Sequence, residues 1–416
     1  MEFKYEPYYQ YFCNVCLNLT DSCNLACKYC FVQQKPHFMT LDTAKKAVDF
    51  MVNNFKKAEE LGYGQKEINL TYFGGEPTLC WDSIIIPLTK YIKENYKDIF
   101  SLNMTTNGTL LNEERIKFLK DNEIHILLSC DGPPEVQDYN RPCRNGEKSS
   151  ELVEKNIPLI LEAFPHTTFR ATINQDNCDK LFDSYVYAIR QGFTNAFFCP
   201  NCREGWSAEN IEKLKKEVHK IFTYMALSYS NDSTVMRFVP IDRIFNTILT
   251  RDLEIFTNQP MNIDTTRNPY RCGLGSGSAS ISYDGKIFGC QEQDSRDTND
   301  YFYIGDIFTG IDIEKHSKIL KDYQEKGIMK CEKEEKCEEC VLRRVCIHDN
   351  CPSVAYDLFK DFKIRPEIDC EWHKMLFEDA ITVMKMMKQE NNMLFKEYLD
   401  SCFTISPKKE ENNNGE

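Results

Sequence analysis

Short strand-like runs alternate with amphipathic helical segments through roughly the first 230 of the chain's 416 residues. This alternation is typical of a parallel sheet covered by helices. The clearest helical segment follows a Thr40 cap, where apolar residues recur at helical spacing from Ala44 to Phe55. Six strand–helix units predict an α/β fold, a partial, TIM-like (β/α)6 barrel with its chemistry on loops at the carboxyl ends of the strands. The candidate strands are 16–20, 68–73, 102–105, 124–129, 169–173 and 196–199.

The pattern changes from about residue 262, where cysteines and loops replace long apolar segments. A small domain organised by metal more than by a hydrophobic core is expected there. Within it, Asp284-Gly285 lies between two short strand-like runs and predicts a hairpin turn. The predicted division is a barrel over 1–235, a helical linker over 236–261, a metal-binding domain over 262–375, a C-terminal helix over 376–402 and a disordered tail over 403–416.

The chain contains 20 cysteines, and their expected role depends on whether the protein lies in a reducing or an oxidising cellular compartment. The N-terminal sequence MEFKYEPYYQ lacks the apolar core of a signal peptide, and no apolar run approaches the roughly 18 residues that span a bilayer. These features predict a cytoplasmic protein without a membrane partner, in which grouped thiols are metal ligands more often than disulfides. The formal net charge of −13 argues against a nucleic-acid partner, because phosphate binding needs clustered positive charge.

Three cysteines lie on one short loop after the first predicted strand. In LTDSCNLACKYCF, the residues Cys23, Cys27 and Cys30 have the spacing Cys-x3-Cys-x2-Cys. Three thiolates can bind three irons of a [4Fe–4S] cubane and leave the fourth iron open, although a zinc site is an alternative. Such a loop, with Tyr29 before the last cysteine, resembles the radical S-adenosylmethionine (SAM) superfamily. The resemblance implies that SAM binds the open iron and is cleaved reductively to a 5′-deoxyadenosyl radical.

The loops after the following strands carry further motifs of this superfamily. Gly74-Gly75-Glu76-Pro77 resembles the family's GGEP loop, which implies that it holds the amino end of SAM. Ordinary turns are the alternative for Thr106-Asn107-Gly108 and for Ser129-Cys130-Asp131-Gly132. Tyr29, Gly75, Ser129 and Arg141 match SAM-contacting positions of the anaerobic sulfatase maturases. The cofactor-binding set implied by the resemblance is Tyr29, Gly74, Gly75, Glu76, Asn107, Ser129, Asp131 and Arg141.

The C-terminal cysteines form a second pattern, Cys272-x12-Gly285-x4-Cys290, then Cys337-x2-Cys340-x5-Cys346-x4-Cys351, and lastly Cys370. It resembles the SPASM domain, in which seven cysteines bind two auxiliary [4Fe–4S] clusters. The resemblance implies one cluster on Cys337, Cys340, Cys346 and Cys370, and a nearer one on Cys272, Cys290 and Cys351. Four residues precede Cys351 where the family usually has three. A zinc ribbon over 337–351 is the alternative, but it would leave the other three cysteines without a role.

The nearer auxiliary cluster is one ligand short of four. The sulfatase maturases have a further cysteine six positions before the first of the seven, and Thr266 stands there in this sequence. An open iron is therefore expected, unless Cys331 closes it. Because thiolate is the form of cysteine that ligates metal, an open iron would bind a substrate thiol. This reasoning predicts a thioether crosslink in a Cys-containing peptide.

Two activities follow from the resemblance, which spans residues from about 12 to about 375. One is a radical SAM maturase of ribosomally synthesised peptides, and the other is an anaerobic sulfatase maturase that makes formylglycine. Sulfatase maturases carry a catalytic Asp where this chain has Gln291, and an amide cannot act as a carboxylate base. The peptide maturase is therefore favoured unless Glu292 or Asp294 substitutes. A non-catalytic Fe–S electron carrier is a third hypothesis, but it would have no use for SAM-binding loops.

The expected partners are a peptide or protein substrate and an electron donor such as flavodoxin or ferredoxin. Many peptide maturases begin with a domain that recognises the leader peptide. The 22 residues before Cys23 are too few for such a domain. A separate recognition protein, or direct docking of the peptide, is therefore expected.

Overall fold

Eleven strands form one sheet in the order β11-β10-β9-β8-β1-β2-β3-β4-β5-β6-β7. The computed structural model describes residues 4–63, 66–231, 233, 235–250, 272–295, 300–324, 330–333, 340, 342 and 351–403. Neighbouring strands are parallel from β8 through β1 to β7, whereas β8, β9, β10 and β11 pair antiparallel. The strands are β1 (Asn14–Asn18), β2 (Ile68–Phe73), β3 (Phe100–Thr106), β4 (Ile124–Ser129), β5 (Thr168–Ile173), β6 (Asn195–Pro200), β7 (Arg237–Phe238), β8 (Ser278–Ile281), β9 (Lys286–Phe288), β10 (Tyr303–Asp306) and β11 (Gly310–Ile311).

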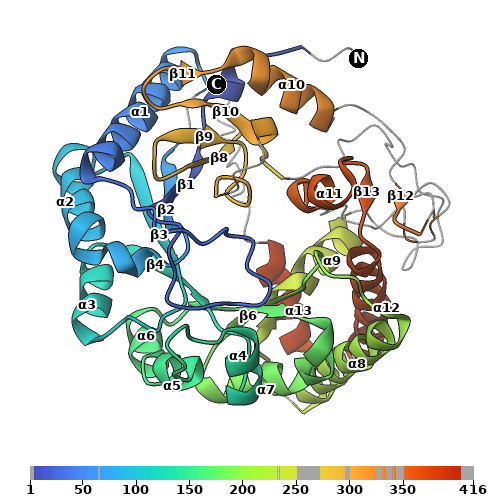
Figure 1. The fold of residues 1–416 in the computed structure, drawn as a ribbon. Coiled ribbons are helices and arrows are strands. Elements are labelled where there is room, and N and C mark those ends of the chain that lie inside the picture. Colours follow the sequence, from blue (N-terminus) through green and yellow to red (C-terminus); the bar gives the residue numbers. More distant parts are fainter. Residues whose placement is uncertain are drawn as a thin grey trace, which may run out of the picture.

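Helices surround the parallel strands as an outer layer, and Figure 1 shows the resulting open ring. The barrel helices are α1 (Leu41–Glu60), α2 (Ile86–Asn95), α3 (Glu113–Asp121), α4 (Pro134–Asn140), α5 (Ser149–Glu154), α6 (Ile157–Ala163), α7 (Leu181–Gln191) and α8 (Ala208–Ser230). The later helices are α9 (Val239–Thr250), α10 (Ile313–Gln324), α11 (Pro352–Phe359), α12 (Glu367–Gln389) and α13 (Met393–Phe403). Short 3-10 and π turns are η1 (Pro7–Gln10), η2 (Pro77–Cys80), η3 (Trp81–Ile85), η4 (Gln175–Lys180) and η5 (Asp300–Phe302), and β12 (Lys330–Cys331) pairs with β13 (Ile364–Arg365).

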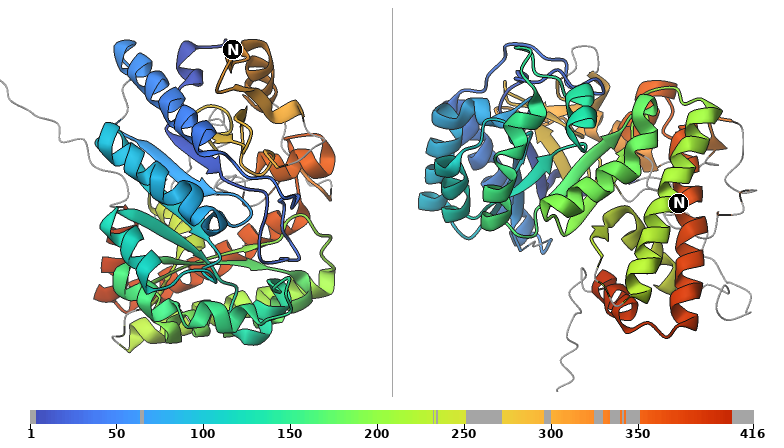
Figure 2. Two further views of the ribbon diagram at one scale, coloured as in Figure 1. Left: turned by 60° about the vertical axis from the view of Figure 1, so that its left-hand side comes forward. Right: turned by 90° about the horizontal axis from the view of Figure 1, so that it is seen from below.

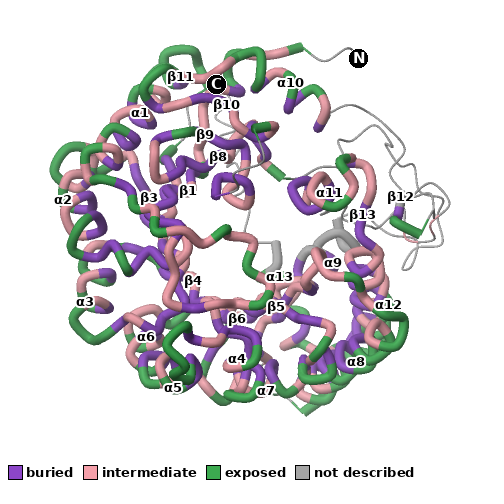
Figure 3. Tube along the Cα trace, viewed as in Figure 1, coloured by how far each residue is buried: buried purple, intermediate pink, exposed green. Residues whose placement is uncertain are grey.

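Alternation along β2 explains how the layers form. Ile68, Leu70 and Tyr72 are buried, and the residues between them are half-buried. The Tyr72 hydroxyl lies 2.9 Å from the Thr89 hydroxyl of α2, so the buried face of this strand packs against the helices. Because side chains alternate across a strand, the half-buried face lines the inside of the barrel. Buried and half-buried positions also alternate along β3 and β5, and Figure 3 colours these two classes purple and pink.

The predicted partial barrel is confirmed, and each of the six predicted strands overlaps one of β1 to β6. The Thr40 side chain accepts a hydrogen bond from the backbone N–H of Thr43, as expected for the cap of α1. Gly285 has φ +91° in the turn between β8 and β9, which is the predicted hairpin.

Two features of the C-terminal half differ from the sequence-based expectations. Strand β8 of the cysteine-rich region pairs with β1, so this region extends the barrel sheet. The long C-terminal helix α12 begins at Glu367, inside the range expected for the metal-binding domain, and packs along α8. Figure 2 shows these two helices side by side at one flank of the barrel. Residues 251–261 of the predicted linker, 262–271 of the predicted metal-binding domain and 404–416 of the predicted tail lie outside the described residues.

Within the described residues, no helix is both long enough and apolar enough to cross a bilayer.

Candidate functional site

The loop between β1 and α1, residues 19–40, carries the three cysteines of the first motif and is called the cluster loop below. Cys23 and Cys27 are half-buried, and Cys30 is exposed. Burial raises the pKa of the Cys23 thiol to about 12 and that of Cys27 to about 11. Protonated thiols do not ligate metal, so a bound cation would have to stabilise their thiolates. Among the described residues, no three His, Cys, Asp or Glu side chains lie close enough to hold a single metal ion.

The glycine pair after β2 packs directly against the backbone of the cluster loop. The Gly75 N–H donates to the Thr20 carbonyl at 2.7 Å, and the Glu76 N–H donates to the Ser22 carbonyl at 2.9 Å. A Cβ atom on Gly75 would lie 2.2 Å from the Ser22 oxygen. Gly74 has φ +138°, where an L side chain is strained, and a Cβ there would lie 2.4 Å from the Thr20 oxygen. Both positions therefore require glycine for the two loops to meet.

Glu76 is buried, and its carboxylate accepts hydrogen bonds from neighbouring residues. Its Oε1 accepts hydrogen bonds from the Thr78 N–H at 3.1 Å, the Thr78 hydroxyl at 2.6 Å and the Thr106 hydroxyl at 2.8 Å. Among the described residues, its Oε2 accepts only from the Asn107 N–H, at 2.8 Å. Burial raises the pKa of Glu76, and these hydrogen bonds oppose that rise. Oε2 is the atom with capacity for a further donor.

Asn107 joins the end of β3 to the cluster loop. Its amide donates to Asn24 Oδ1 at 2.9 Å, and the same nitrogen lies 3.9 Å from the Cys23 sulfur. The Asn24 amide donates to the Thr109 hydroxyl at 2.8 Å. Asn24 was not among the predicted site residues, and nothing in its sequence context distinguishes it.

Asp131 and Arg141 form a buried ion pair beyond β4, with Arg141 Nη2 3.0 Å from Asp131 Oδ1. The Tyr29 hydroxyl donates to Asp131 Oδ2 at 2.6 Å, and the Arg141 guanidinium lies over the Tyr29 ring. The Nε of Arg141 is buried without a hydrogen-bond partner. Ser129, at the end of β4, is half-buried on the inner face of the barrel. A buried guanidinium N–H without an acceptor indicates a site for an anionic group.

These contacts fit the zwitterionic amino-acid end of SAM. Glu76 Oε2 would accept from its ammonium, and Arg141 would donate to its carboxylate. Tyr29, on the cluster loop, contacts this ion pair, and Ser129 lies two residues before Asp131 at the end of β4.

The second cysteine group is brought together from distant segments. Burial raises the pKa values of the Cys290 and Cys351 thiols, and each is raised further by neighbouring thiols, which include Cys272. Cys272 is exposed, while Cys290 and Cys351 are half-buried. The three cysteines that the resemblance assigns to the nearer cluster therefore lie close enough to interact electrostatically.

The other predicted cluster is described only in part. Cys370 lies within hydrogen-bonding reach of Cys331, and this contact is the largest cause of the raised pKa of Cys370. Cys331 therefore lies beside Cys370, which the resemblance assigns to the other auxiliary cluster. Cys340 is half-buried, whereas Cys337 and Cys346, like Thr266, lie outside the described residues.

Arg203, in the loop after β6, connects the two cysteine groups and was missed by sequence reasoning. Its Nη2 lies 2.6 Å from Glu292 Oε2 and 3.0 Å from Asp357 Oδ2. The same Glu292 oxygen accepts from the Cys351 thiol at 3.7 Å. The Arg203 guanidinium also lies 5.8 Å from the ring centre of Phe31 in the cluster loop. No local sequence signal indicates this pairing, because the partners are 89 and 154 residues away.

Residues 17–181 match the family model of the Radical SAM superfamily. They form a radical SAM domain. The chain is 25% identical over 191 residues to the radical SAM cyclopropyl synthase TigE of Paramaledivibacter caminithermalis, covering 42% of this chain and 38% of TigE. It is 27% identical over 188 residues to a cysteine-type anaerobic sulfatase-maturating enzyme of Clostridium novyi, covering 44% and 49%. The chain thus spans less than half the length of these two named relatives.

Two solved structures share the fold of this chain. The structure of anSMEcpe with bound AdoMet has a TM-score of 0.71 at 20% identity, covering 94% of this chain and 98% of that one. The same protein has been solved with bound AdoMet and the Cp18Cys peptide, with a TM-score of 0.67 at 20% identity, covering 91% and 99%. At this identity the likeness establishes the shared fold over both the barrel and the cysteine-rich region.

Proposed function

We propose that this protein is a cytoplasmic radical SAM maturase that modifies a peptide or protein, and that its product is a thioether crosslink in a Cys-containing, ribosomally synthesised peptide. The observation that carries the proposal is the chain of contacts through Arg203. This residue lies over Phe31 of the cluster loop and pairs with Glu292, which contacts Cys351. These contacts support the proposal that the two cysteine groups act on the same substrate.

The residues of the radical SAM domain have separable roles in this proposal. Cys23, Cys27 and Cys30 would hold a [4Fe–4S] cluster, and Glu76 and Arg141 would orient SAM. The cluster and SAM together would supply a 5′-deoxyadenosyl radical that abstracts hydrogen from the substrate. Asp131 holds Arg141 and Tyr29 in place through the hydrogen bonds described above. A flavodoxin or ferredoxin would supply the electron.

The thioether is favoured over formylglycine by the groups around Cys290. Gln291 stands where a sulfatase maturase would need a carboxylate. Of the two acids that could substitute, Glu292 is paired with Arg203 at 2.6 Å, and Asp294 is buried against Asn18 and Ser280. The placement of Cys331 beside Cys370 further supports an open position in the nearer auxiliary cluster.

An anaerobic sulfatase maturase remains the second candidate, because a named relative has that activity and Asp294 is only four residues from Cys290. The products distinguish the two functions. Thioether formation removes two hydrogens from a Cys-containing peptide without creating a carbonyl, whereas formylglycine carries an aldehyde that reacts with a hydrazide. Mass spectrometry of candidate peptides before and after hydrazide treatment therefore separates the candidates.

The first test is SAM cleavage by the anaerobically reconstituted protein under dithionite. We expect 5′-deoxyadenosine formation and about twelve irons per chain, as three cubanes require. Replacing Cys23, Cys27 and Cys30 together by Ala should abolish 5′-deoxyadenosine and remove about a third of the iron. As a control, Cys178→Ala removes a buried thiol that donates to the Asn210 carbonyl, and should leave both values unchanged. Cleavage that survives the triple substitution would refute the assignment, and absence of cleavage by the wild type would favour an electron carrier.

A further inference from the structure

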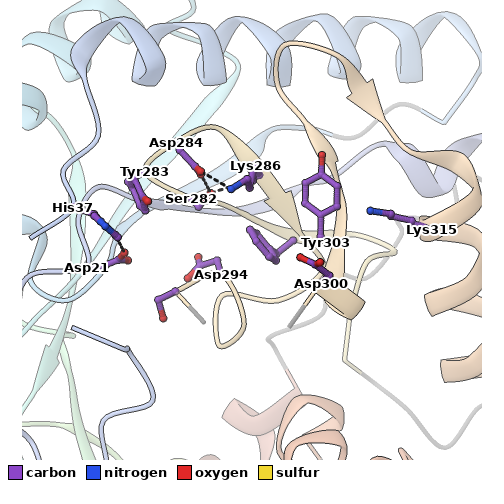
Figure 4. Close-up of a pocket in the computed structure, with 12 residues that line it drawn as sticks. Asp21, His37, Ser282, Tyr283, Asp284, Lys286, Asp294, Asp300, Tyr303 and Lys315 are labelled. Atoms are coloured by element: carbon purple, nitrogen blue, oxygen red, sulfur yellow. Dashed lines mark hydrogen bonds and ion pairs between the residues drawn. The ribbon is translucent and has the colours of Figure 1, made fainter. Parts of the chain in front are cut away.

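A small cavity lies between the cluster loop and the β8–β9 hairpin, with a volume of about 260 Å³. Figure 4 shows Asp21, His37 and Asp294 on one side of it, with Asp300, Tyr303 and Lys315 on the other. Whole small-molecule sites typically occupy roughly 300 to 1,000 Å³. The cavity is therefore of a size for one side chain of a larger ligand.

The inner wall of the cavity carries a carboxyl group without a positive partner. Asp294 is 7% exposed, accepts from the Asn18 amide at 3.2 Å and is bonded to the Ser280 hydroxyl. No basic side chain pairs with it in the part of the chain that the structure describes. Burial raises the pKa of Asp294 to about 8, and the nearby charge of Asp21 contributes to that rise. A cation in the cavity would favour the ionised carboxylate.

The basic groups that line the cavity already have partners. Lys286 pairs with Asp284 at 2.8 Å, and the Lys315 ammonium lies 4.5 Å from the ring centre of Tyr303. His37 bonds to Asp21 at 3.0 Å and stacks on the Tyr283 ring. None of these contacts neutralises Asp294.

A second observation on the same wall is a hydroxyl group that lacks a hydrogen-bond partner among the described residues. Ser295 lines the cavity beside Asp294 and is 6% exposed. Its hydroxyl oxygen is buried and has no hydrogen-bond partner. Buried hydroxyls are normally bonded to protein, water or ligand. A donor-rich group in the cavity would satisfy Ser295 and Asp294 together.

We propose that this cavity binds the ammonium or guanidinium group of a lysine or arginine side chain of the substrate peptide. The inference rests on the proposed function, because it assumes a peptide substrate. It also states where that peptide would be held. Asp21 lies two residues before Cys23, and its backbone packs against Gly75, so a side chain in the cavity would fix the peptide beside the SAM site. The peptide should therefore carry a basic residue close to the residue that is modified.

Binding of capped tripeptides to the reconstituted holoenzyme tests the proposal without requiring turnover. Acetyl-Gly-Lys-Gly-amide and its arginine analogue are compared with the norleucine analogue by isothermal titration calorimetry. We expect both basic peptides to bind at least tenfold more tightly than the norleucine peptide. Asp294→Asn should remove this preference, and Asp300→Asn, at the exposed rim, should reduce it. The control Glu209→Gln changes net charge equally on an exposed acid of α8 and should preserve the preference.

Equal affinities for the lysine and norleucine peptides would overturn the proposal, as would a preference that Asp294→Asn and Asp300→Asn both leave intact. Tight binding of a divalent cation that displaces the lysine peptide would identify the cavity as a metal site instead. If Asp294→Asn does not fold, Asp300→Asn and Ser295→Ala decide the question. SAM cleavage is measured on the same samples. Retained 5′-deoxyadenosine formation with no peptide preference would refute the cavity assignment alone, whereas loss of cleavage by the wild type would refute the proposed function.

Discussion

At the scale of single residues, Glu76 combines a structural role with a proposed ligand role. Three of its four hydrogen bonds in the described structure use Oε1 and hold the loop after β2, so Oε2 is the atom proposed to accept from a SAM ammonium. Glu76→Gln would remove a charged acceptor, an interaction worth about 1.5 to 3 kcal/mol. We expect SAM affinity to fall by about tenfold to a hundredfold while iron content is retained. Equilibrium binding of SAM checks this, with exposed Glu94→Gln of α2 as the control. Unchanged affinity would exclude the contact.

The raised pKa of Asp294 predicts how the stability of the folded protein depends on pH. Its folded pKa of about 8 lies above the ordinary carboxyl value of 3.8, so the folded state binds an extra proton between these two pH values. Stability should therefore fall as pH rises from about 4 to about 8, by an amount on the order of a few kcal/mol. Asp294→Asn removes this titration. Denaturant unfolding from pH 5 to 8.5 should show a shallower pH dependence in the variant than in the wild type, and parallel curves would contradict the assignment.

At the scale of elements, the contact between the glycine loop and the cluster loop sets the geometry of the radical SAM site. A Cβ on Gly75 would collide with the backbone at Ser22 and Asp21, which cannot move without displacing the cysteines. Gly75→Ala should therefore lose most of the iron at Cys23, Cys27 and Cys30, and with it 5′-deoxyadenosine formation. Gly205→Ala is the matched control, since nothing lies within 4 Å of its Cβ position. Full iron content in Gly75→Ala would show that the loops do not need this close approach.

At the scale of the whole molecule, Arg203 connects the barrel to the cysteine-rich region. Its partners Glu292 and Asp357 are largely buried, so removing the guanidinium takes away a charge-assisted hydrogen bond from each of them. Arg203→Met should lower stability by about 1 to 3 kcal/mol and increase hydrogen exchange in α11. Lys213→Met breaks an exposed pair with Glu209 on α8 and should lower stability much less than Arg203→Met does. Equal effects of the two substitutions would show that Arg203 does not hold the two regions together.

The sequence by itself determined the elements and the motifs. Local alternation predicted the six barrel strands, since burial of one face imposes period 2, and the Thr40 cap and the Asp284-Gly285 turn depend on neighbours in sequence. The Cys-x3-Cys-x2-Cys spacing and the glycine pair each lie within a single loop. The resemblance to the radical SAM superfamily could therefore be identified from the sequence alone.

Only the tertiary structure decided which distant groups meet. Pairing of β8 with β1 joins residues more than 260 positions apart, and it carries the cysteine-rich region onto the barrel sheet. The Arg203–Glu292 pair, the placement of Cys331 beside Cys370 and the burial of Asp294 are consequences of that packing. No periodicity encodes such contacts, because they depend on how whole elements are arranged and on which side chains lose water when those elements meet.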